Sequence, residues 1–140
     1  MKLARNSSSS ILGLIPARGG SRRLPQKNIR NFAGRPLIAW TIKAAQYANK
    51  IDFVAVSTEN PHISEISKKL SVDCVIDRPS SLAADDTSTT DVVLHALQFL
   101  RKKNLNFSAL VLLQPTSPLR TNIHIDEACS IFESKNLSGL

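Results

Sequence analysis

One short loop, residues 16–28, holds the residue types best suited to binding an anion. Gly19 and Gly20 have no side chains, so the backbone amides there can approach a ligand and form a nest for anionic oxygens. Arg18 and Lys27 add positive charge, and an arginine can donate two parallel hydrogen bonds to one phosphate group. The glycine and lysine spacings fit neither a Walker A loop nor a GxGxxG fingerprint. These residues alone predict a phosphate site or, as the alternative, a solvated basic turn.

The segments around this loop predict an α/β fold that would position it. Short apolar runs alternate with segments whose apolar residues recur at helical spacing. This pattern is typical of a mostly parallel sheet with right-handed crossovers, and such sheets bind ligands at the carboxyl ends of their strands. The loop 16–28 and the loops after the other strands would meet there. Strands are expected at residues 11–15, 53–56, 72–76 and 107–113, and helices at 36–48, 61–70, 90–103 and 122–133.

The positive charge is concentrated in the first third of the chain. The net charge is +7, yet residues 1–51 contain ten lysines and arginines and no acidic residue. A basic region of this kind indicates a polyanionic partner or a solvated face. No stacking aromatic residues are interleaved with the basic ones, which argues against nucleic acid. A small phosphorylated ligand is the favoured interpretation.

Two further features limit the class of protein. Cys74 and Cys129 lie far apart in sequence and outside any Cys/His cluster, which predicts two buried reduced thiols rather than a disulfide or a zinc site. The apolar run at residues 11–15 is too short for a membrane span or a signal peptide. We therefore expect a cytoplasmic protein that does not interact with membranes.

Several motifs follow one another along the chain: Ile15-Pro-Ala-Arg-Gly-Gly-Ser21, Leu24-Pro-Gln-Lys-Asn28, Gly34-Arg-Pro-Leu-Ile38, Val56-Ser-Thr58, Arg78-Pro79 with Leu82-Ala83 and Asp85, and Leu113-Gln-Pro-Thr-Ser-Pro-Leu-Arg120. In this order they resemble the motifs of the acylneuraminate cytidylyltransferases, also called CMP-sialic acid synthetases. The resemblance covers nearly all of residues 12–133. It implies a Rossmann-like sheet of the nucleotide-diphospho-sugar transferase type.

The resemblance implies a nucleotidyltransferase that joins CTP to the anomeric hydroxyl of a nine-carbon keto sugar acid and releases pyrophosphate. Arg18 and Lys27 would hold the triphosphate and act in catalysis, and Gln114 would lie on the sugar-acid side. The implied nucleotide-binding set comprises Arg18, Gly19, Gly20, Ser21, Lys27, Asn28, Arg78, Ser88 and Thr89, where Ser88 and Thr89 are alternatives for one hydroxyl position.

The chain departs from the family pattern at its carboxyl end. Family members continue further and there supply two Mg²⁺-binding aspartates and a segment that forms a homodimer. We therefore expect a polar tail at residues 1–10 and an incomplete nucleotide-binding domain at residues 11–140, a fragment with little activity alone. No metal ligand is assigned, because Asp85, Asp86 and Asp91 are better explained by turns and helix capping.

Three alternatives stay open at this point. The sugar acid could be KDO, legionaminic acid or pseudaminic acid, because the first loop is shared among these enzymes, although residues 114–120 favour the nine-carbon acids. The chain could also be a nucleotide-binding module without catalysis. A basic nucleic-acid binder ranks last, because a triphosphate already accounts for the basic residues.

Overall fold

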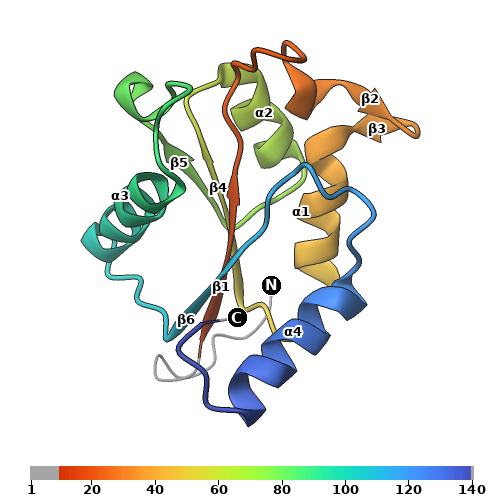
Figure 1. The fold of residues 1–140 in the computed structure, drawn as a ribbon. Coiled ribbons are helices and arrows are strands. Elements are labelled where there is room, and N and C mark those ends of the chain that lie inside the picture. Colours follow the sequence, from red (N-terminus) through yellow and green to blue (C-terminus); the bar gives the residue numbers. More distant parts are fainter. Residues whose placement is uncertain (1–9, 140) are drawn as a thin grey trace.

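Four parallel strands form the centre of the structure, a computed structural model that describes residues 10–139 (Figure 1). The sheet has the order β5-β4-β1-β6, with β1 paired to both β4 and β6. This arrangement confirms the expected Rossmann-like fold. The strands are β1 (Ile11–Pro16), β4 (Phe53–Thr58), β5 (Cys74–Asp77) and β6 (Ala109–Leu112).

Helices cover both faces of this sheet because the side chains of its strands alternate between two apolar cores. On β1, Ile11 and Ile15 pack with α1, α2 and α4, whereas Leu12 and Leu14 pack with α3 on the opposite face. Figure 1 shows α3 separated by the sheet from α1 and α4. The helices are α1 (Leu37–Tyr47), α2 (Pro61–Lys69), α3 (Thr89–Lys102) and α4 (Asn122–Ser134).

Polar residues fix where three of the helices begin. The side chain of Asn60 accepts hydrogen bonds from two backbone amides of α2, and Pro61 occupies the first helical position. Ser88 caps α3 and Thr121 caps α4 in the same manner. The observed helices lie within a few residues of the expected ones, since the capping residues can be recognised in the sequence.

A small hairpin between β1 and α1 was missed. It pairs β2 (Asn31–Phe32) with β3 (Arg35–Pro36) through a turn in which Gly34 has φ 92°. Strands of two residues are too short to show an alternating pattern, so the sequence predicts Pro36 as the start of the following helix, whereas the structure places it in β3. Two short 3-10 helices, η1 (Lys27–Ile29) and η2 (Ser80–Leu82), were also not expected.

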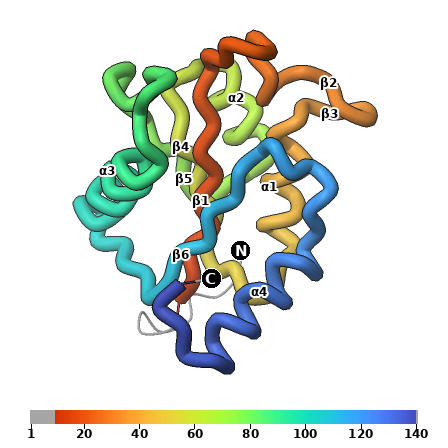
Figure 2. Tube along the Cα trace, viewed as in Figure 1, coloured from red at the N-terminus to blue at the C-terminus, as the bar shows by residue number. Residues whose placement is uncertain are grey.

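The strand expected at residues 107–113 is shorter than predicted. All four residues of β6 are half-buried, and among the described strands β6 pairs with β1 alone. Phe107, just before it, packs on the ring of Phe53 with centroids 5.3 Å apart. After β6 the chain passes along α1 before it turns into α4, as the tube in Figure 2 shows.

Other expectations have mixed outcomes. Cys74 and Cys129 are both free thiols, but Cys74 is half-buried rather than buried. Of the tail expected at residues 1–10, residues 1–9 lie outside the described part. Ser10 is buried, and its carbonyl oxygen accepts a hydrogen bond of 2.9 Å from the amide of Ser108. No helix within residues 10–139 has the length and apolar character needed to cross a membrane.

Candidate nucleotide-binding cleft

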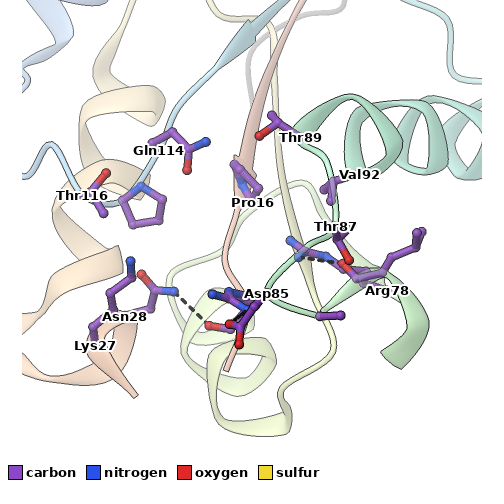
Figure 3. Close-up of a pocket in the computed structure, with 14 residues that line it drawn as sticks. Pro16, Lys27, Asn28, Arg78, Asp85, Thr87, Thr89, Val92, Gln114 and Thr116 are labelled. Carbon is purple, nitrogen blue, oxygen red and sulfur yellow. Dashed lines mark hydrogen bonds and ion pairs between the residues drawn. The ribbon is translucent and has the colours of Figure 1, made fainter. Parts of the chain in front are cut away.

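A cleft with a volume of about 210 Å³ lies at the carboxyl ends of the strands (Figure 3). Its walls come from the loop after β1, the segment between β5 and α3, and the loop after β6. Parallel strands bring these segments together although they are far apart in sequence. Six of the residues singled out from the sequence line this cleft: Arg18, Lys27, Asn28, Arg78, Thr89 and Gln114.

Four other candidates do not line the cleft. The hydroxyl of Ser88 is occupied by helix capping, because it accepts from the amide of Asp91 at 3.0 Å and donates to the Asp91 carboxylate at 2.7 Å. The hydroxyl of Ser21 lies 3.4 Å from the amide of Leu24, within its own turn. Gly19 and Gly20 are likewise not among the lining residues. Of the two alternatives for the hydroxyl position, the structure places Thr89 in the cleft.

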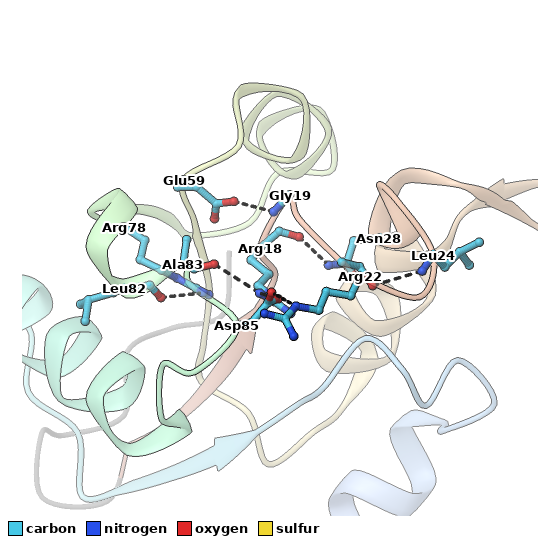
Figure 4. Close-up of polar contacts among 11 residues, drawn as sticks. Arg18, Gly19, Arg22, Leu24, Asn28, Glu59, Arg78, Leu82, Ala83 and Asp85 are labelled. Carbon is cyan, nitrogen blue, oxygen red and sulfur yellow. Dashed lines mark hydrogen bonds and ion pairs between the residues drawn. The ribbon is translucent and has the colours of Figure 1, made fainter.

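Gly19 has a structural reason for being glycine. A Cβ at this position would lie 3.0 Å from Cβ and Cγ of Asn60 and still closer to its amide nitrogen, which leaves no room for it. Gly20 differs, because a Cβ there would meet nothing within 4 Å. The Gly19 amide also donates a 2.6 Å hydrogen bond to the carboxylate of Glu59 (Figure 4). Glu59 thus occupies an amide that the sequence assigned to a phosphate.

The two glycines are therefore expected to respond differently to alanine. Gly19→Ala should push Asn60 away from the start of α2 and lower the free energy of unfolding by about 1 to 2 kcal/mol, the typical worth of a helix cap. Gly20→Ala is the matched control and should change it by less than about 0.5 kcal/mol. Urea unfolding followed by circular dichroism measures both. Equal losses in the two variants would show that Gly19 is not sterically constrained.

Asp85 forms ion pairs with two arginines, which the sequence does not predict. Asp91 lies in the first turn of α3 as expected, but Asp85 does not serve a turn or a cap alone. Its Oδ1 accepts a 2.6 Å bond from Nη1 of Arg18, and its Oδ2 accepts from Nε of Arg22 (Figure 4). The hydrogen bond from Arg18, and to a lesser extent the one from Arg22, holds the pKa of Asp85 below its usual value. The expectation that Asp85 serves only a turn or a cap is therefore wrong. The conformations of two loops bring Asp85 into contact with the distant loop after β1.

Asn28 offers an unused acceptor in the cleft. Its side chain is only 4% exposed, and its amide nitrogen donates to the carbonyl of Arg18 at 3.0 Å. Its Oδ1 has no hydrogen-bond partner in the structure. A buried polar atom without a partner is costly, so a ligand donor at this place would be stabilised.

Arg78 forms the base of one wall. It is 5% exposed, and its guanidinium donates to Ser57 through Nε to Oγ at 3.1 Å and Nη2 to the carbonyl at 2.8 Å. A third bond of 3.5 Å reaches the carbonyl of Leu82. Burial lowers the pKa of this guanidinium, while the carboxylate of Glu59 opposes the effect. These bonds use part of its five donors, so Arg78 can still donate to a ligand.

The remaining candidates lie around the opening. Lys27 begins η1, Thr89 begins α3, and Gln114 follows β6, so each comes from a different wall (Figure 3). Thr87 and Thr116 also line the cleft and were not singled out from the sequence. In the sequence, only the position of Thr116 after a strand and of Thr87 before a helix indicates that they could line a cleft, and this signal is weak.

The described cleft residues do not by themselves fit a Mg²⁺ centre. Asp85 is the acidic residue among those lining the cleft, and its carboxylate is engaged by two arginines. Within residues 10–139, no three His, Cys, Asp or Glu side chains gather as metal ligands would.

Comparison with known proteins identifies the family of the chain. The family model described as Cytidylyltransferase matches residues 12–136. The chain is 38% identical to CMP-N,N'-diacetyllegionaminic acid synthase of Legionella pneumophila, over 86% of this chain and 52% of that protein. It is 34% identical to N-acylneuraminate cytidylyltransferase of Escherichia coli, over 90% of this chain and 29% of that protein.

Solved structures give the same fold. A CMP:2-keto-3-deoxy-manno-octonic acid synthetase complexed with CTP superposes with a TM-score of 0.73 at 22% identity, over 90% of this chain and 48% of that one. The chain thus spans between 29% and 52% of the length of these relatives. The family match covers nearly all the described residues, and the chain therefore belongs to the cytidylyltransferase family.

Proposed function

We propose that this chain provides the CTP-binding part of an enzyme that transfers CMP to a nine-carbon keto sugar acid, an N-acylneuraminate. The observation that carries the proposal is the convergence of Arg18, Lys27 and Asn28 on one cleft, together with the buried Oδ1 of Asn28, which has no hydrogen-bond partner in the structure. The two cations suit phosphate oxygens. The acceptor suits an exocyclic amino group such as that of cytosine.

The proposed reaction is an in-line displacement at the α-phosphorus. The anomeric hydroxyl oxygen of the sugar acid forms a bond to this phosphorus and releases its proton to solvent. The bond between the α-phosphorus and the oxygen that bridges it to the β-phosphorus breaks, and this oxygen leaves with the pyrophosphate. Such a transfer depends on positioning and on neutralising charge rather than on a covalent enzyme intermediate. Arg18 and Lys27 would hold the departing phosphates, and Gln114 would face the sugar acid.

The choice of an N-acylneuraminate rests on the similarity of residues 113–120 to a motif of the acylneuraminate cytidylyltransferases. Relatives named for sialic, legionaminic, pseudaminic and 3-deoxy-manno-octulosonic acids all match this chain. A panel of these acids with CTP, run on a full-length version of the protein and scored by pyrophosphate release, separates the possibilities. Fastest release with N-acetylneuraminate is the expected result, and preference for another acid would reassign the substrate.

Nucleotide binding can be tested on the chain itself. Isothermal titration calorimetry should show CTP binding more tightly than UTP, because the Asn28 oxygen would accept a hydrogen bond from the amino group of cytosine but would meet an acceptor at the same position of uracil. About tenfold discrimination against UTP is expected for one such mismatch. A folded sample with no affinity for CTP would contradict the proposal.

A second candidate is a nucleotide-binding module without turnover. The absence of a second carboxylate among the described cleft residues favours it. In that case CTP binds in the calorimeter, and no sugar acid in the panel yields pyrophosphate. Pyrophosphate release by the purified chain would exclude this candidate.

A further inference from the structure

Asp85 fills the place in the cleft that an anionic ligand would need. Its carboxylate connects two guanidinium groups of the loop after β1, with Oδ1 bound to Nη1 of Arg18 at 2.6 Å and Oδ2 bound to Nε of Arg22. The same Nη1 also donates to the carbonyl of Ala83 at 3.3 Å. Figure 4 shows this carboxylate between the two arginine side chains. A carboxylate resembles the edge of a phosphate group in charge and in its two acceptor oxygens.

A phosphate at Arg18 and the carboxylate of Asp85 cannot share these donors. If Asp85 stayed in place, its negative charge would lie beside those of the phosphate, and like charges at such distances repel. A ligand phosphate that reaches Arg18 must therefore replace the bond from Asp85. The exchange is feasible because the side chains of Arg18 and Asp85 are 30% and 37% exposed, and ion pairs open to solvent contribute little.

The other carboxylate at this loop is in a different situation. Glu59 accepts from the amide of Gly19 at 2.6 Å, and the next residue, Asn60, caps α2 while in tight contact with Gly19. The position of Glu59 is thereby fixed, because the next residue caps the start of α2. Asp85 lies in the segment between η2 and α3, outside both helices. Of the two carboxylates, Asp85 is the one free to move.

We propose that Asp85 is an internal counter-ion of the phosphate-binding loop, which a polyphosphate displaces when it binds. Resting on the proposed CTP function, this makes Asp85 a residue that tunes affinity for the phosphate moiety and leaves affinity for the nucleoside unchanged. Displacement also frees the segment from Ala83 to Ser88 from the loop after β1. This segment carries Thr87 into the cleft and leads to Thr89.

Substitution of Asp85 by Asn tests the proposal, because Asn keeps the shape and removes the charge. Asp86→Asn is the matched control, since Asp86 is exposed and does not line the cleft. By calorimetry, Asp85→Asn should bind CTP and tripolyphosphate about fivefold more tightly than the unsubstituted protein, a change typical of one exposed ion pair. Cytidine should bind both proteins equally, and Asp86→Asn should match the unsubstituted protein throughout.

A labelling experiment reports the same contact without any ligand. Phenylglyoxal modifies accessible guanidinium groups, and mass spectrometry locates the modified residue. Arg18 should be modified faster in Asp85→Asn than in the unsubstituted protein, whereas Arg101, exposed on α3, should react at the same rate in both. If Asp85→Asn proves unfolded by circular dichroism, CTP protection of Arg18 in the unsubstituted protein is compared with protection of Arg101, and lack of selective protection overturns the proposal.

The outcomes separate this inference from the proposed function. Equal or weaker CTP binding by Asp85→Asn, with CTP bound by the unsubstituted protein, overturns the counter-ion role and leaves the CTP proposal standing. Weaker binding of cytidine as well would show that Asp85 only shapes the cleft. Tighter tripolyphosphate binding by Asp85→Asn without CTP binding by either protein supports the counter-ion and overturns the CTP proposal. If neither protein binds either ligand, both proposals fall.

Discussion

Arg78→Ala is expected to lower the free energy of unfolding by about 2 to 3 kcal/mol. The guanidinium is almost fully buried and donates to both oxygens of Ser57, at the end of β4. Removing it leaves the buried Ser57 hydroxyl without this partner and opens a cavity, and each effect is costly. The Ser57 carbonyl keeps the amide of Ala17 as a donor at 2.9 Å, which limits the loss. Urea denaturation measures the change.

The control for this prediction is Arg23→Ala. Arg23 also carries one positive charge but is exposed, so its loss should change stability by less than about 0.5 kcal/mol. Arg78→Lys separates charge from geometry, because lysine cannot bind both Ser57 oxygens as a planar fork does. We expect Arg78→Lys to lie between the unsubstituted protein and Arg78→Ala. If Arg78→Ala and Arg23→Ala had the same free energy of unfolding, the hydrogen bonds of Arg78 would not stabilise the wall of the cleft.

Arg18→Ala is expected to weaken CTP binding by about 10- to 150-fold. A hydrogen bond to a charged group typically contributes about 1.5 to 3 kcal/mol, which corresponds to this range of dissociation constants. The variant also leaves the Asp85 carboxylate paired with Arg22 but no longer with Arg18, so that more of its negative charge opposes the phosphates. Calorimetric titration with CTP provides the measurement. Arg18→Ala combined with Asp85→Asn should recover part of the affinity.

A charge-matched control separates a direct contact from the general field of the protein. Arg101 lies in the last turn of α3, exposed and outside the cleft, so Arg101→Ala removes the same charge without touching the ligand. It should change CTP affinity less than twofold at physiological salt, where exposed charges are largely screened. Equal effects of Arg18→Ala and Arg101→Ala would indicate that Arg18 acts only through long-range attraction.

The sequence predicted the fold better than the details of the cleft. Runs such as residues 11–15 are buried on both sides by helices, so their continuous apolar character is a strong signal of a parallel strand. The shared edge of the sheet then follows from topology. The motifs indicated which residues belong to the cleft, and six of those residues line it together, although their roles toward CTP stay predictions.

The contacts inside the cleft could not be read in the same manner. The bond between Arg18 and Asp85 depends on two irregular loops whose conformations no local pattern determines. Gly19 and Gly20 look equivalent in sequence, yet of the two only Gly19 lies against Asn60. The difference arises from how the start of α2 packs against the loop. The β2–β3 hairpin could not be predicted for a related reason, because a strand of two residues is too short to show the alternation of apolar and polar side chains.

The central position of β1 has a consequence for how the chain folds. This strand comes first along the described chain, but its two neighbours come much later: Leu12 pairs with Phe53, and Ile11 pairs with Ala109. Contacts between residues so distant in sequence slow folding, because a long loop must close before they form. During synthesis, β1 therefore leaves the ribosome well before β6, and its apolar side stays open until then. A variant that delays this closure would reduce the yield of folded protein even when its final stability is unchanged.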